Sequence, residues 1–271
     1  MIYERIYLDE NKETYIDTYV SELRFVTRPA MLVIPGGGYR HVCADREGEA
    51  VAEAYLARGF NAFVLQYRVG DGHRYPEQLI DAARAILHIR ANAEHYNVDP
   101  CRVFAVGFSA GAHLAGSLGL LSGDPIVLDT LGVTAEDITP QAIVLSYPVV
   151  SAYSPTHEGS FVNLLGKPFD LLTEDERDKY SLECNVTPDS PPAFIWHTAT
   201  DQSVPPLGSM RLASAYINAG VAVSLHIYPY GPHGISLADE FSNSAQAGIQ
   251  PLAQRWIDDS VDFIRSLKFD N

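Results

Sequence analysis

One serine is set apart by its surroundings in "VFAVGFSAGAHLAGSLG", residues 103–119. Ser109 stands between Gly107 and Gly111 in a G-x-S-x-G arrangement, directly after an apolar run and before a small-residue helical pattern. A sharp strand-to-helix turn of this kind exposes the hydroxyl at a helix N-terminus, where N–H groups stabilise developing negative charge. The chemistry that suits such a serine is attack on a carbonyl carbon. Glycines at a tight turn also serve packing, so the motif alone leaves both interpretations open.

A nucleophilic serine needs a base, and the base needs an acid that orients it. Asp201 follows the apolar run "AFIWHT", and His233 follows the apolar run "VSLHIY". The order Ser, Asp, His, with each member just after a strand, is that of an α/β-hydrolase triad. His197 and His226 lie inside the strand runs themselves, which favours core positions. We therefore predict a catalytic triad of Ser109, Asp201 and His233.

A glycine-rich loop, "IPGGGYRHV" at 34–42, follows another apolar run. Consecutive glycines let backbone N–H groups approach a substrate closely, and the loop lacks the pattern of a phosphate-binding loop. We expect the N–H groups of Gly37 and Gly38, together with that of Ala110 after the serine, to form an oxyanion hole. Three side chains that follow the glycines are expected to line the substrate: Tyr39, Arg40 and His41.

The elements that must position these residues are visible as six near-continuous apolar runs. They lie at 30–35, 60–67, 102–108, 142–150, 193–198 and 223–228. Runs without alternation are typical of strands buried on both faces of a parallel sheet. Amphipathic helical patterns lie between most of them, at 46–60, 75–96, 205–220 and 251–267. The alternation predicts an α/β fold with a doubly wound, mostly parallel sheet.

Two regions do not follow this alternation of strands and helices. Residues 1–28 alternate polar and apolar side chains, which predicts an antiparallel edge of the sheet. Residues 151–190 hold no strand-like run and fall where an insertion over the carboxyl edge would lie, so we expect a small lid there. The whole chain, 1–271, is expected to form a single domain.

Composition restricts the class of partner. The formal net charge of −15 disfavours nucleic acid, and no stretch is apolar enough to span a membrane. The first ten residues lack the features of a signal peptide, so a cytoplasmic location is expected. Three widely spaced cysteines, Cys43, Cys101 and Cys184, indicate neither a disulfide framework nor a zinc site. We expect a small-molecule ester substrate with no metal or organic cofactor, and the sequence leaves open whether the chain forms homo-oligomers.

Four motifs together, "PGGGY", "GFSAG", "TDQSVP" and "GPHG", resemble those of the α/β-hydrolase esterases of the hormone-sensitive-lipase-like group. More closely, the chain resembles bacterial acetyl-esterase and xylan-esterase-like enzymes from about residue 25 to the end. The resemblance implies an eight-stranded sheet and hydrolysis of short acyl esters, commonly acetyl groups on sugars. It also implies that Ser109, Asp201 and His233 act as the triad. Pro35 stands where the lipase-like group usually has a histidine, which favours the sugar-esterase branch.

The function that these observations predict is that of a serine esterase for short acyl esters, chiefly acetyl esters on sugars or xylo-oligosaccharides. An arylformamidase would use the same triad on an N-formyl aromatic substrate, and a general carboxylesterase or lipase would use it on other esters. A hydrolase fold kept as a non-catalytic binding protein normally lacks a member of the triad, and none is missing here.

Overall fold

The predicted strands pair in one eight-stranded sheet in the computed structural model, which describes residues 1–268. The strand order is β1-β2-β4-β3-β5-β6-β7-β8; β2 pairs antiparallel with both β1 and β4, and all the other pairs are parallel. Their bounds are β1 Arg5–Tyr7, β2 Tyr15–Tyr19, β3 Arg28–Ile34, β4 Asn61–Gln66, β5 Val98–Phe108, β6 Ile143–Ser146, β7 Ala193–Thr198 and β8 Val223–Tyr228. This arrangement confirms the mostly parallel α/β sheet with its antiparallel N-terminal edge.

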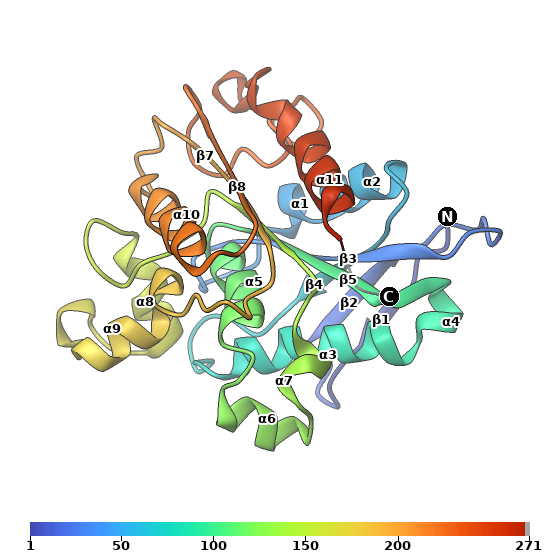
Figure 1. Cartoon of the computed structure of the whole chain (residues 1–271), viewed down its shortest axis with the longest axis horizontal. Helices are drawn as coiled ribbons and strands as arrows, with labels where there is room; N and C mark the ends of the chain where they lie inside the picture. Colours follow the sequence, from blue (N-terminus) through green and yellow to red (C-terminus); the bar gives the residue numbers. More distant parts are fainter. Residues whose placement is uncertain (269–271) are drawn as a thin grey trace.

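Helices cover both faces of the sheet (Figure 1). They are α1 Ala44–Glu47, α2 Glu49–Ala57, α3 Glu77–Ala91, α4 Ala93–Tyr96, α5 Ala110–Leu120, α6 Pro125–Leu131, α7 Ala135–Ile138, α8 Glu158–Leu165, α9 Glu174–Tyr180, α10 Leu207–Ala219 and α11 Trp256–Ser266. The helices α3, α5 and α10 contribute to the larger buried cluster on one face, and α2 and α11 contribute to the second cluster on the other. Crossover helices on both faces are what parallel strands require.

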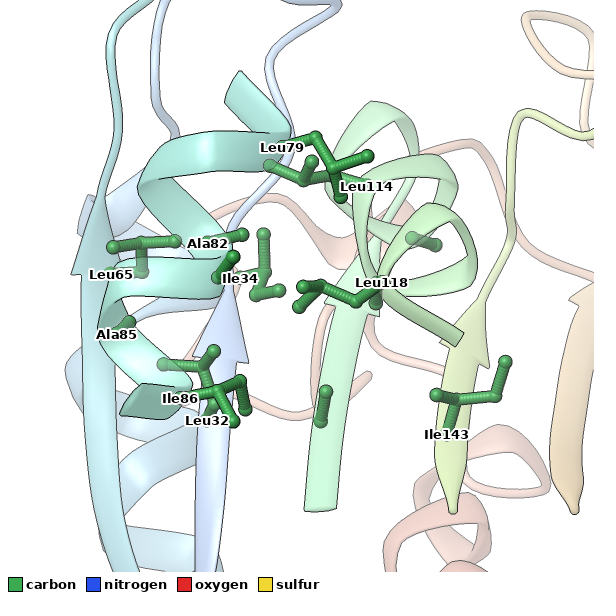
Figure 2. Packing of buried hydrophobic residues seen from close by; sticks show 14 of the residues in the cluster. Leu32, Ile34, Leu65, Leu79, Ala82, Ala85, Ile86, Leu114, Leu118 and Ile143 are labelled. Atoms are coloured by element: carbon green, nitrogen blue, oxygen red, sulfur yellow. The ribbon is translucent and has the colours of Figure 1, made fainter. Parts of the chain in front are cut away.

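Alternate side chains of the central strands point to opposite clusters. In β3, Leu32 and Ile34 join the α3 and α5 side, whereas Met31 and Val33 join the α2 and α11 side. Figure 2 shows Leu32 and Ile34 against α3 and α5. Because both faces are buried, these strands read as continuous apolar runs in the sequence.

The predicted strand at 142–150 is shorter in the structure. β6 ends at Ser146, and Tyr147 takes a positive φ of 36°. The Tyr147 N–H still donates to Trp196 O at 2.7 Å, but the chain then turns away from the sheet. The predicted helix at 75–96 is likewise divided, since α3 ends at Ala91 and α4 begins at Ala93.

The segment 151–190 forms helices α8 and α9 and two short 3-10 turns, with no strand. Its residues Phe161, Leu172 and Tyr180 form a small buried cluster together with Val149 and Val204. Leu182 in the second turn packs against Gly116 of α5, where an added Cβ would lie 2.6 Å from a Leu182 methyl. The segment is therefore fastened to the helix that begins at Ser109.

Candidate active site

Ser109 occupies a strained turn between β5 and α5. Its φ and ψ are 55° and −118°, a conformation that few residues other than glycine adopt. The flanking glycines are there for space: a Cβ on Gly107 would lie 2.2 Å from Gly111 O, and one on Gly111 would lie 2.3 Å from Ile34 O. The turn therefore depends on close backbone packing, and it leaves the serine hydroxyl at the N-terminus of α5.

The three residues predicted as a triad meet at the carboxyl ends of β5, β7 and β8. His233 Nε2 lies 2.8 Å from Ser109 Oγ, and His233 Nδ1 lies 2.7 Å from Asp201 Oδ2. The Asp201 side chain is fully buried, whereas that of His233 is 20% exposed. With Nδ1–H donating to the carboxylate, Nε2 is free to accept the serine proton. The geometry is that of a nucleophile, a base and an orienting acid.

Asp201 is held as a carboxylate by several donors. The N–H groups of Ser203 and Val204 donate to Oδ1 at 2.8 and 2.9 Å, and His197 Nε2 lies 3.2 Å from Oδ2. Burial alone would raise the pKa of Asp201, but hydrogen bonds from His197 and His233 and from the Val204 backbone hold it well below its usual range. The acid is therefore charged at neutral pH and able to orient and stabilise a protonated His233.

His197 was expected to be a core residue of the strand, and its side chain is indeed fully buried in β7. No pattern in the sequence indicates its contact with Asp201. His197 Nδ1 lies 2.8 Å from Ser209 Oγ, and Nε2 also lies 3.0 Å from Val204 O. The ring thus supports the acid and the loop that carries it.

The glycine loop leaves N–H groups unpaired beside Ser109. Gly37 and Gly38 have φ values of +123° and +65°, and a Cβ on Gly37 would lie 2.1 Å from His41 O. Within residues 1–268, the N–H groups of Gly37, Gly38 and Ala110 donate to no protein acceptor. These three donors are the predicted oxyanion hole. The carbonyl of Gly38 is fixed by Asn163 of α8, whose Nδ2 donates to it at 2.8 Å.

A buried carboxylate that the sequence did not reveal joins the glycine loop to the histidine loop. Glu47 Oε2 accepts from Gly36 N–H at 2.8 Å, and Oε1 accepts from the Tyr147 hydroxyl at 2.8 Å. Tyr147 in turn accepts from Ser236 N–H at 3.0 Å, and its ring packs edge-on against that of His233, 5.0 Å between centroids. Burial raises the pKa of Glu47 despite these hydrogen bonds. No motif marks this residue, because its role arises only where three loops meet.

The three residues after the glycines divide into two groups. Arg40 and His41 line the cavity in front of Ser109, and their contact with substrate stays a prediction. Tyr39 does not: its ring is 1% exposed, and its hydroxyl lies 2.8 Å from Nδ1 of His113. The expectation for Tyr39 was wrong because its positive φ of 57° carries the side chain into the core beneath the loop.

The catalytic cavity has a volume of about 850 Å³ and contains Ser109, His233, Gly37 and Gly38 in its wall. The segment 151–190 forms part of this wall through His157, Gly159 and Asn163. Burial and the nearby His233 lower the pKa of His157. Whether this segment moves as a lid remains a prediction, but its position beside the serine agrees with one.

Over the described range 1–268, no three His, Cys, Asp or Glu side chains converge as a metal site. The helices of that same range are too short or too polar to cross a membrane.

The chain resembles known proteins over most of its length. The model of the BD-FAE family matches residues 16–216. The chain is 38% identical to an endo-1,4-beta-xylanase B of Butyrivibrio fibrisolvens over 84% of this chain and 36% of that protein. It is 30% identical to an acetylxylan esterase of Xylanibacter ruminicola over 78% of this chain and 42% of that protein. The chain therefore spans less than half the length of either relative.

Solved structures match over almost the whole chain. An acetyl ester-xyloside bifunctional hydrolase from Caldicellulosiruptor lactoaceticus has a TM-score of 0.82 and 33% identity, covering 97% of this chain and 96% of its own. A carboxylesterase from Lactobacillus plantarum has a TM-score of 0.84 and 28% identity, covering 98% and 97%. These likenesses confirm the α/β-hydrolase fold and the resemblance to acetyl-esterase and xylan-esterase-like enzymes. Because the family model matches most of the length of the chain, the chain belongs to the BD-FAE family of α/β-hydrolases.

Proposed function

We propose that this protein is a serine esterase that removes short acyl groups, chiefly acetyl, from hydroxyl groups of sugars such as xylo-oligosaccharides. The observation that carries the proposal is the hydrogen-bonded series Ser109–His233–Asp201 beside three unpaired N–H groups. The names of the relatives, an acetylxylan esterase and an acetyl ester-xyloside hydrolase, support the substrate class.

The reaction would proceed by acyl transfer in two steps. Ser109 Oγ attacks the ester carbonyl carbon while His233 Nε2 takes the hydroxyl proton. The carbonyl oxygen becomes an oxyanion and accepts hydrogen bonds from the N–H groups of Gly37, Gly38 and Ala110. When this tetrahedral intermediate collapses, the bond between the carbonyl carbon and the alkoxy oxygen breaks. The alkoxy oxygen takes the proton from His233 and leaves as the alcohol. Water then attacks the acyl-serine, His233 again takes a proton, and the carboxylic acid departs as Ser109 recovers its hydrogen.

The direct test is Ser109→Ala with p-nitrophenyl acetate as substrate. Turnover should fall to background, because no other group in the site replaces the nucleophile. Ser117→Ala is the matched control: Ser117 lies on the same helix, and its hydroxyl only donates to His113 O at 2.8 Å. Full activity in Ser109→Ala would reject the proposal.

The acyl and alcohol preferences are tested with a second set of substrates. Acetylated xylo-oligosaccharide should be turned over with a higher kcat/KM than p-nitrophenyl butyrate or octanoate. N-formylkynurenine tests the arylformamidase alternative on the same triad. A preference for the formamide or for the octanoate would replace the sugar ester as the substrate class.

A further inference from the structure

A second cavity of about 1090 Å³ adjoins the catalytic one. Asp71, Gly159 and Asn163 line both cavities, so the two lie directly beside one another. Asn163 stands at the junction, where its Nδ2 also fixes the carbonyl of Gly38 in the oxyanion loop. An acetyl group needs only a small part of this space. The second cavity is therefore available to the alcohol side of the ester.

The free polar groups of this cavity are hydrogen-bond acceptors. Within the described residues, the carboxylates of Asp71 and Asp170 have no hydrogen bond or ion pair, and that of Glu158 accepts only from Ser154. All three side chains belong to exposed residues of the cavity wall. A ligand that donates several hydrogen bonds, such as a polyol, would satisfy them.

The cations of the same wall are already engaged by protein acceptors. Arg74 Nη1 donates to Gly70 O and His73 O at 2.7 and 2.8 Å. Lys167 pairs with Glu176 at 2.6 Å, and Arg177 donates to backbone carbonyls. These groups are less available to an anionic ligand than free cations would be. The wall therefore favours a neutral ligand over a carboxylate or phosphate.

Aromatic surface completes the cavity. The Arg177 guanidinium lies 4.5 Å from the ring centroid of Phe169 and 5.9 Å from that of Tyr153, so it holds both half-buried rings in place. Pockets that combine aromatic faces with a few fixed polar groups bind organic ligands with defined orientation. With so many charged side chains in its wall, the cavity does not suit a long acyl chain.

We infer that this second cavity is a subsite for the unacylated part of a neutral oligosaccharide, and that it holds the sugar units beyond the one carrying the ester. The inference rests on the proposed sugar-ester function and adds the location of the extended chain. Because Asn163 joins the subsite to the oxyanion loop, a longer saccharide should raise kcat and not only lower KM.

The test measures binding apart from catalysis. Xylotetraose without acyl groups and xylose are titrated calorimetrically into the wild-type protein, the double variant Glu158→Ala/Asp170→Ala and Asp129→Ala. Asp129 is an exposed aspartate on α6 that lines neither cavity, so its variant is the matched control. Loss of two hydrogen-bond acceptors should weaken xylotetraose binding by at least about fivefold in the double variant and not in Asp129→Ala.

Xylotetraose that binds no more tightly than xylose overturns the inference, and so does equal weakening in the double and control variants. In parallel, the ratio of kcat/KM on acetylated xylotetraose to kcat/KM on p-nitrophenyl acetate should fall in the double variant. A wild-type protein that hydrolyses neither ester refutes the proposed function, while the calorimetry still decides whether the saccharide subsite exists.

Discussion

His113 joins three segments around the site and makes their association sensitive to acid. Its ring lies buried on α5, where Nε2–H donates to Tyr180 O at 2.8 Å at the end of α9. With that nitrogen protonated, Nδ1 is the acceptor for the Tyr39 hydroxyl at 2.8 Å. Tyr39 directly follows Gly38 of the predicted oxyanion hole. Both nitrogens are thus satisfied only in the neutral ring.

The size of the effect follows from the pKa. Burial lowers the pKa of His113 from the ordinary 6.5 to about 4, against a smaller opposing effect of the hydrogen bond to Tyr180 O. The unfolded chain therefore binds a proton at this residue below pH 6.5, whereas the folded chain resists protonation down to about pH 4. Stability is present above pH 6.5 and is lost as the pH falls. At about 1.4 kcal/mol per pKa unit, the free energy of unfolding should drop by about 2 kcal/mol between pH 7 and pH 5 from this group.

The measurement is urea unfolding at pH 7, 6 and 5 for the wild type and His113→Gln. The variant has a lower stability at pH 7, because the amide does not reproduce both hydrogen bonds, but it should lack this part of the pH dependence. The difference between the two pH profiles isolates His113 from the other titrating groups. Parallel profiles, with no difference of about 2 kcal/mol between pH 7 and pH 5, would refute the reasoning.

Three further substitutions test the site, each measured with p-nitrophenyl acetate and by thermal unfolding. Gly37→Ala places a Cβ 2.1 Å from His41 O at a φ of +123°, so the glycine loop must move. Because the movement displaces an oxyanion donor, kcat should fall about 100-fold. A fall in kcat of less than threefold would contradict the role of Gly37 as a donor. In Asp201→Asn, the amide oxygen still accepts from the backbone N–H donors, and the NH2 group faces His233, which then carries its proton on Nε2. The ring can no longer accept the serine proton there, so kcat should fall about 10³-fold or more with the fold retained. Near-normal turnover would argue against the triad. Tyr147→Phe removes the hydrogen bond to buried Glu47 and should lower the free energy of unfolding by about 1–3 kcal/mol; an unchanged melting temperature would show that this contact adds nothing to stability.

Most strands of the sheet were predictable, because a buried strand is recognised from its own run of residues. Buried parallel strands must be apolar on both faces, so the strands β3, β4, β5 and β7 were visible as continuous runs. Element ends were less predictable. β6 ends just before Tyr147, whose hydroxyl donates a hydrogen bond to Glu47, a residue 100 positions away in the chain.

The sequence by itself determined the order of the chemical groups and the turn that carries Ser109. Glycines are required there because an added Cβ on Gly107 or Gly111 would lie 2.2 or 2.3 Å from a backbone oxygen. A carboxylate and a histidine had to follow two later strands. Only the tertiary structure decided which neighbours tune these groups. Glu47, His197 and His113 act across loops and layers, and nothing in their local sequence distinguishes them from core or surface residues. Burial raises the pKa of Glu47 and lowers that of His113, and this burial arises only when distant segments are brought together.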